Sequence, residues 1–310
     1  MKKRIQKKPV RQTKDQSQQE GGYANLIQSS FRKFEENPIL LVPNALALLS
    51  SLALAVLLLS MTGILGVIMA VPAALTKGVY LVTAVYALMT ADPARFWGVV
   101  TLYLVAEFFV SLFFITTKYG MIKDVILVGR TSLKSGFAFG KKHLLDVTGI
   151  YILSLLMILA PMLLIVLAGV ILMPRTLLGG IVVMGLFALL AILYAGFVIY
   201  RLIFVYPIMA FEQEGPMRSI RDDFHYVKTH IGHTFITWIV LLCMGAVYVI
   251  IKSPIETLKG IATDGYLIIL LTGIIAILEV LVSTWEHIFI FKAYLAGKRR
   301  NRSEDRAKHK

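Results

Sequence analysis

Charged side chains interrupt several long apolar stretches of the sequence. Glu107, Glu279 and Glu286 each lie within an apolar run, and Arg201 lies near the end of another. Ionised groups at membrane depth are costly, so they usually face a bundle interior, a water-filled cavity or one another. Because seven residues make about two helical turns, Glu279, Ser283 and Glu286 are expected to share one face of a helix. These residues are the candidate polar site of the protein.

Two uses of this polar site are open. Tyr200–Phe204 resembles Trp285–Phe289, and the resemblance places Arg201 and Glu286 at equivalent depth. It predicts an ion pair between them that fixes the register of two helices, which is the more common use of such charges. Alternatively, the three glutamates line a polar path for a cation, a proton or a zwitterionic headgroup.

The apolar runs that position these residues are long enough to cross a membrane. The chain has 310 residues, of which 57% are hydrophobic and 16% are charged, and its mean hydropathy is +0.76. A soluble domain has about 25% charged residues, and a helix needs about 20 apolar residues to cross a bilayer. The sequence therefore predicts an all-α, polytopic transmembrane bundle with six spans, at about 39–60, 97–117, 147–172, 178–205, 234–251 and 266–291.

Positive charge is distributed unevenly around these spans. Loops rich in Lys and Arg stay in the cytoplasm, so we expect cytoplasmic N- and C-termini. Segment 62–90 is also apolar, but a further span there would move the basic loop 118–142 outside. We therefore expect 62–90 to be an interfacial or re-entrant segment on the outer face. Of the 32 Lys and Arg residues, five then lie outside: Lys77, Arg95, Arg175, Lys252 and Lys259.

Self-similarity indicates an internal repeat. Ser132–His143 resembles Ser219–His230 at an offset of 87 residues (132 to 219), and Tyr119 matches Tyr206 at the same offset. Apolar spacings of three and four residues also recur before three of the spans, which is typical of amphipathic helices. We predict three tandem units, each an amphipathic helix followed by a transmembrane hairpin. The predicted units are about 23–118, 119–205 and 206–297, between a disordered basic tail at 1–22 and a basic tail at 298–310.

The amphipathic stretches and the basic surface are expected at the inner face of the membrane. A purely structural collar is the more common role for such helices. Alternatively, they sense lipid or dock a partner, since each Lys or Arg near anionic headgroups contributes about 1 kcal/mol of attraction. No recognition fold accompanies the basic C-tail, so we expect no nucleic acid as a partner.

Histidines gather in the loop before the fifth predicted span. His230 and His233 are spaced to share a helix face and could bind a divalent metal, and His225 lies nearby. The more ordinary interpretation is that these histidines tolerate the headgroup zone, and we predict no metal site and no cofactor. The sequence contains no Walker-type loop, no His-Glu-x-x-His and no Gly-x-Ser-x-Gly, so we predict no catalytic residue.

Short motifs resemble a known family. They are Asn37-Pro38 before the first span, the Tyr-Gly or Tyr-Pro steps at 119 and 206, and the segment Glu214–His230. Together they resemble poorly characterised prokaryotic six-span proteins, similar to the membrane domain fused to some glycerophosphodiester phosphodiesterases. The resemblance covers roughly 25–297 and implies a helical membrane domain with no assigned reaction. It also implies a prokaryotic plasma membrane, and the phosphodiesterase barrel is absent.

These observations favour a non-enzymatic membrane protein with an organising, lipid-sensing or scaffold role. Its expected partners are the phospholipid bilayer and anionic headgroups at the inner face, and the sequence points to no particular protein partner. The alternative is a small transporter or flippase-like carrier that uses buried carboxylates. An intramembrane enzyme, in which Asp146, Ser283 and His287 meet, is a third possibility.

Overall fold

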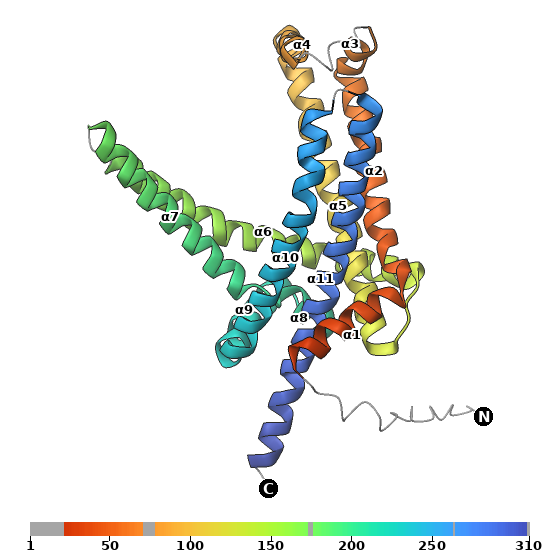
Figure 1. The fold of residues 1–310 in the computed structure, drawn as a ribbon, viewed down its shortest axis with the longest axis vertical. Coiled ribbons are helices and arrows are strands. Elements are labelled where there is room, and N and C mark those ends of the chain that lie inside the picture. Colours follow the sequence, from red (N-terminus) through yellow and green to blue (C-terminus); the bar gives the residue numbers. More distant parts are fainter. Residues whose placement is uncertain (1–21, 71–77, 173–175, 263, 309–310) are drawn as a thin grey trace, which may run out of the picture.

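The computed structural model describes residues 22–70, 78–172, 176–262 and 264–308, so nearly all of the predicted N-terminal tail lies outside the described residues. Within these ranges the chain is helical, with no strand (Figure 1). Six helical segments are long and apolar enough to cross a membrane, and each overlaps one predicted span. The predicted all-α, polytopic bundle is confirmed, and the chain is a multi-pass integral membrane protein.

Consecutive long helices pair into three hairpins. A short 3-10 turn, η2 (Pro38–Leu41), leads directly into the first of these helices. Figure 1 shows the second hairpin leaning away from the other two. The first hairpin joins α2 (Val42–Met61) to α5 (Pro93–Val128), the second joins α6 (Leu133–Ile171) to α7 (Leu177–Arg201), and the third joins α10 (Ile231–Ile261) to α11 (Gly265–Lys308).

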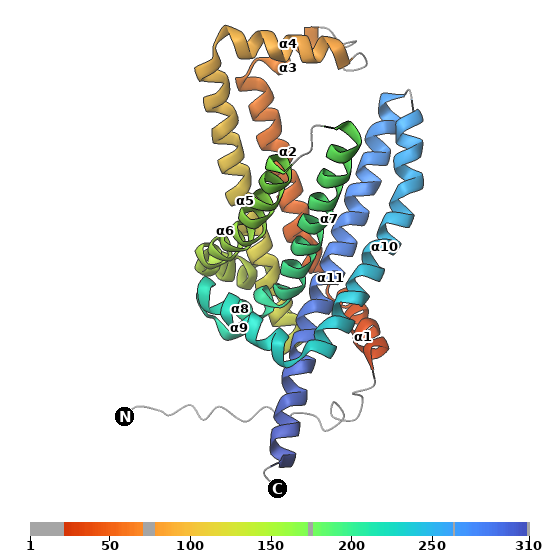
Figure 2. The same ribbon diagram turned by 90° about the vertical axis from the view of Figure 1, so that its left-hand side faces the viewer.

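Two short helices connect α2 to α5 at one end of the bundle. They are α3 (Ile64–Ala70) and α4 (Gly78–Ala91), and Figure 2 shows them lying across the ends of the first hairpin. Neither is among the helices long enough to cross a membrane. The segment 62–90 therefore does not add a described span. Asp92 then caps α5 by accepting a hydrogen bond from the Arg95 backbone N–H at 3.1 Å.

The opposite end of the bundle carries three further short helices, and we call it the collar end. These helices are α1 (Tyr23–Glu35), α8 (Val205–Glu212) and α9 (Pro216–Thr229). The expected amphipathic helices at the first and third positions are α1 and α9. The stretch at 133–144 is not a separate helix but the first turns of α6, because Ser132 caps the helix and no proline follows until Pro161.

Two predicted boundaries also fall inside helices. The boundary at 118 lies within α5, which continues to Val128. The basic tail at 298–310 continues α11 as far as Lys308. Helix-forming residues continue past both positions, so each helix runs on without a break.

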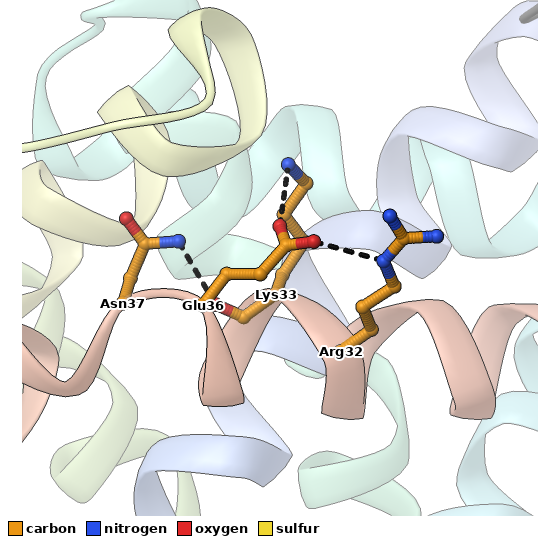
Figure 3. Close-up of polar contacts among 4 residues, drawn as sticks. All are labelled: Arg32, Lys33, Glu36 and Asn37. Carbon is orange, nitrogen blue, oxygen red and sulfur yellow. Dashed lines mark hydrogen bonds and ion pairs between the residues drawn. The ribbon is translucent and has the colours of Figure 1, made fainter.

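Polar contacts end α1 and fix it to the third hairpin. Arg32 and Lys33 pair with Glu36 at 2.8 and 3.3 Å, and Asn37 donates to the Lys33 carbonyl oxygen at 3.1 Å (Figure 3). In addition, the Trp285 indole N–H donates to Ser30 Oγ at 3.0 Å. Although α1 precedes the first hairpin in the chain, it packs against α11.

The buried core lies at the collar end. Only 6% to 17% of the residues in each apolar window are buried, because most side chains at membrane depth face outward. The close crossing of α5 and α6 uses glycines, and a Cβ at Gly140 would lie 2.4 Å from Thr117 Oγ1. Fully buried side chains gather where α5, α8 and α11 meet: Met121, Ile122, Val125, Ala210, Ile288 and Phe291. The collar end is therefore the tightly packed region where the hairpins meet.

Candidate functional site

Glu107 is held inside the first hairpin. Ser51 on α2 donates to its carboxylate at 2.5 Å, and Ser111 donates to the same oxygen at 3.1 Å. The other carboxylate oxygen is buried without a hydrogen-bond partner in the described part of the chain. Glu107 therefore joins α2 to α5, and no described contact links it to Glu279.

The predicted ion pair between Arg201 and Glu286 is wrong. The Arg201 guanidinium lies over the rings of Phe197 and Phe224, 5.3 and 5.9 Å from their centroids. No ion pair with Glu286 is formed among the described residues, because α7 ends on the side of α9 rather than against α11. Arg201 instead packs the end of α7 through cation–π contacts.

Glu286 lies close to a residue that the sequence analysis assigned to a loop. Lys118, on α5, is 2% exposed and interacts electrostatically with Glu286. Its ammonium group also donates to Ser283 Oγ at 3.4 Å. The predicted set on α11 is therefore completed by a cation from α5. The signal that could have revealed this is Gly129, whose φ of 88° marks the true end of α5.

A histidine and a tyrosine continue this polar cluster toward the collar end. His287 Nδ1 contacts the Ser283 carbonyl oxygen, and its Nε2 lies 3.3 Å from the Tyr119 hydroxyl. Because a carbonyl oxygen can only accept, Nδ1 carries a proton and donates it to the Ser283 carbonyl oxygen. The two contacts of the imidazole fix its orientation.

A cavity of about 430 Å³ opens next to this cluster. Its walls come from the second and third hairpins and are mostly apolar, including Ile158, Ile203 and Leu242. Its floor, at the collar end, carries Tyr119, Tyr206 and His287. The Tyr119 and Tyr206 rings are in contact, with centroids 5.0 Å apart. The Tyr206 hydroxyl forms no hydrogen bond with a described residue, so it is available to a bound molecule.

Glu279 lies farther along α11 than the cavity, and its side chain is exposed. It interacts electrostatically with Lys252 on α10, which pairs directly with Glu256 at 3.0 Å.

Comparison of the chain with protein-family models, curated proteins and solved structures finds no match. The family resemblance suggested by short motifs stays a prediction, and the site has to be interpreted from its own geometry.

The predicted histidine group is dispersed. His225 is exposed, whereas His230 contacts the Tyr226 carbonyl oxygen at 2.9 Å. His233 contacts the Ala293 carbonyl oxygen at 2.8 Å and the Tyr23 hydroxyl at 2.5 Å. No group of three metal-ligating side chains occurs among the residues that the structure describes. The contact of His230 stays at the end of α9, whereas those of His233 join α10 to α11 and α1.

The side chains of the intramembrane enzyme, the third possibility that the sequence left open, are also not brought together. Asp146 is 2.9 Å from His143, its neighbour one turn earlier on α6. Ser283 and His287 lie on α11, where His287 contacts the serine backbone rather than its hydroxyl. These three side chains do not form a catalytic triad.

Proposed function

We propose that this protein is a non-enzymatic membrane protein that binds a phospholipid at its collar end and thereby senses or organises the bilayer. The observation that carries the proposal is the cavity with apolar walls and a polar floor. Lipid-binding sites combine apolar lining with a few placed polar groups. Here acyl chains would lie between the second and third hairpins, and the headgroup would meet Tyr119, Tyr206 and His287.

The depth of the floor supports a lipid rather than a soluble ligand. Tyr206 follows directly after the end of α7, so the floor lies where an apolar helix leaves the bilayer. A larger hollow of about 640 Å³ lies along the second hairpin. Its single polar side chain, Tyr194, already donates to the Met157 carbonyl oxygen at 2.8 Å. That hollow offers nothing to a headgroup, whereas the cavity does.

The collar end is proposed to face the cytoplasm. The described basic residues at the far end are Arg95, Lys252 and Lys259, and the others lie at or near the collar end. Basic segments favour the cytoplasmic side, and they attract anionic headgroups of the inner leaflet. The bound lipid would therefore come from the inner leaflet of a plasma membrane.

The proposed internal repeat gives this floor a simple origin. Tyr119, Tyr206 and Phe291 occupy equivalent positions at offsets of 87 (119 to 206) and 85 residues (206 to 291). Tyr119 contacts both of the others, with ring centroids 5.0 and 5.6 Å apart. Tyr119 begins the second proposed unit, and Tyr206 begins the third, which also contains Phe291. The repeat would therefore place related aromatic rings where the hairpins converge.

The test is lipid retention measured by native mass spectrometry on protein titrated with phosphatidylethanolamine and phosphatidylglycerol. Ile158 lines the cavity and Leu159, the next residue, is 51% exposed on the lipid-facing side. Ile158→Trp should fill the cavity and lose the bound lipid, whereas Leu159→Trp should retain it. Equal retention by both variants, or no retention by the wild type, would show that the cavity is not a lipid site.

A further inference from the structure

The third hairpin carries polar side chains along most of its length. From the collar end outward they are His287, Glu286, Ser283 and Glu279 on α11, then Lys252 and Glu256 on α10. Ion pairing between Lys252 and Glu256 occurs near the far end of α10. In the described residues between their two ends, the first hairpin carries one charge, Glu107, and the second carries none. The charges therefore span the apolar depth of one hairpin rather than gathering at one level.

The polar residues of α11 face the same side as the cavity. Ile290 and His287 line the cavity. Counting back from Ile290, Glu286, Ser283 and Glu279 follow at spacings of four, three and four residues. Residues at such spacings lie on one face of a helix. The polar face of α11 therefore begins at the cavity floor and leads toward the far end.

The polar residues of α10 continue this face. Trp238 lines the cavity, and Lys252 follows 14 residues later (238 to 252), which is about four helical turns. Gly245 lies halfway between them, and a Cβ there would meet no atom within 4 Å. Glu256 is one further turn along the same face. Figure 1 shows the second hairpin leaning away from the third, so α7 does not follow α10 and α11 over their whole length.

Glu279 requires polar surroundings that the described residues supply only in part, through Lys252. Its side chain is exposed at membrane depth and forms no hydrogen bond or close ion pair with them. A carboxylate facing hydrocarbon costs several kcal/mol, about 2.5–3.5 on insertion scales. Lys252 on α10 interacts electrostatically with Glu279 but pairs directly with Glu256, so it offsets only part of this cost. A polar group from outside the chain would offset the rest.

We propose that this polar face is a track for phospholipid headgroups, and that the protein lets phospholipids cross between the two leaflets. The proposal rests on the proposed lipid site, because the track opens into that cavity. The charges along it have both signs, with Lys252 positive and Glu286, Glu279 and Glu256 negative. A zwitterionic headgroup carries a phosphate for the lysine and an ammonium for the glutamates. Its acyl chains remain in the bilayer beside the gap between the hairpins.

This movement needs no energy source. The sequence has no Gly-rich phosphate-binding loop of the Walker type. A headgroup that exchanges one set of charged partners for the next moves down its own concentration difference in either direction. No bond of the lipid is formed or broken. The expected activity is therefore passive, bidirectional exchange of phospholipids between leaflets.

The experiment is a dithionite assay on proteoliposomes that contain a fluorophore-labelled phosphatidylethanolamine in both leaflets. Wild-type protein should expose the inner-leaflet label to the reductant, whereas empty liposomes protect it. The double variant Glu279→Gln/Glu286→Gln should slow exchange by about tenfold, equivalent to about 1.4 kcal/mol on the barrier. The matched control is Glu107→Gln, which changes a carboxylate outside the track and keeps an acceptor for Ser51.

The outcomes separate this proposal from the lipid site itself. If the wild type retains lipid in mass spectrometry but exchanges none, the track is wrong and the lipid site stands. If it neither retains nor exchanges lipid, both proposals fail. If Glu279→Gln separates a dimer into monomers and exchange continues unchanged, a second copy of the chain covers Glu279 and the track is wrong.

Discussion

The first and third hairpins each hold a glutamate at membrane depth, but the polar partners of the two carboxylates differ. Glu107 in the first hairpin accepts hydrogen bonds from Ser51 and Ser111. Glu279 in the third hairpin is exposed, and it interacts electrostatically with Lys252 on the other helix. The difference comes from the facing helix, which supplies a hydroxyl in one case and none in the other.

This difference separates a structural charge from a functional one. A carboxylate with local partners stabilises helix packing and can be explained within the monomer. A carboxylate without them raises the free energy of the folded protein in the membrane, unless an external group covers it. The same residue type in two equally apolar helices therefore points to two roles.

The largest expected effect tests whether helices pack tightly beside the first hairpin and leave space beside α10 of the third hairpin. In Gly140→Ala the new Cβ would lie 2.4 Å from Thr117 Oγ1, so the Thr117 side chain or the crossing of α5 and α6 would have to shift. Overpacking of this kind typically costs about 1–3 kcal/mol. Gly245→Ala on α10 meets nothing within 4 Å and should gain up to about 1 kcal/mol of helix propensity.

Thermal unfolding in detergent measures both glycine variants. The midpoint should fall for Gly140→Ala and stay level or rise for Gly245→Ala. A fall of similar size in both would mean that α10 is packed on the side that this structure leaves open. In that event the polar track would also lack the space it requires.

The next effect compares the two glutamates directly. Glu107→Ala leaves the Ser51 and Ser111 hydroxyls without their acceptor, which should cost about 2 kcal/mol. Glu279→Leu removes a charge that has no close partner, so the unfolding midpoint should stay level or rise. Equal destabilisation by both substitutions would contradict the distinction between the two hairpins.

A smaller effect concerns Asp223 on α9, a carboxyl group buried at the start of α8. Burial raises the pKa of Asp223 well above its usual range, although the backbone N–H groups of Phe204 and Val205 favour the charged form. The folded protein therefore holds this proton to higher pH than the unfolded chain does. Stability is highest below the ordinary pKa of 3.8 and falls as pH rises through the raised pKa.

Asp223→Asn should remove this loss of stability at higher pH. Its unfolding midpoint should exceed that of the wild type at pH 7 and equal it near pH 4. Circular dichroism melts at a series of pH values measure the difference. A constant difference between Asp223→Asn and wild type at all pH values would disprove the role of this titration.

The sequence predicts the spans well and the helix ends poorly. Apolar runs locate the six spans, because the bilayer requires a minimum apolar length. They fail at Lys118, where a charge ends the apolar run but α5 continues to Val128 and stops at Gly129. Hydropathy indicates which residues contact lipid, whereas capping residues such as Gly129 indicate where a helix ends.

The candidate site was predicted in part for the same reason. Helical spacing correctly groups Ser283 and Glu286, since their relation lies within one helix. It cannot show that Lys118 joins them or that Tyr119, Tyr206 and His287 form one floor, because those contacts join three different helices. The incorrect Arg201–Glu286 pair has the same origin, since equal depth does not imply that two helices are adjacent.

The smallest expected effect adds a third environment for a carboxylate. Glu36 at the end of α1 is exposed to water, and hydrogen bonds from Arg32 and Lys33 lower its pKa below the usual 4.5 (Figure 3). Its contribution to stability is present above pH 4.5 and is lost as pH falls through the lowered pKa. Exposed ion pairs contribute little, so Glu36→Gln should leave the unfolding midpoint unchanged at pH 7. A clear loss at pH 7 would mean that α1 is held by this pair rather than by Trp285 and Ser30, and that water does not screen the collar end.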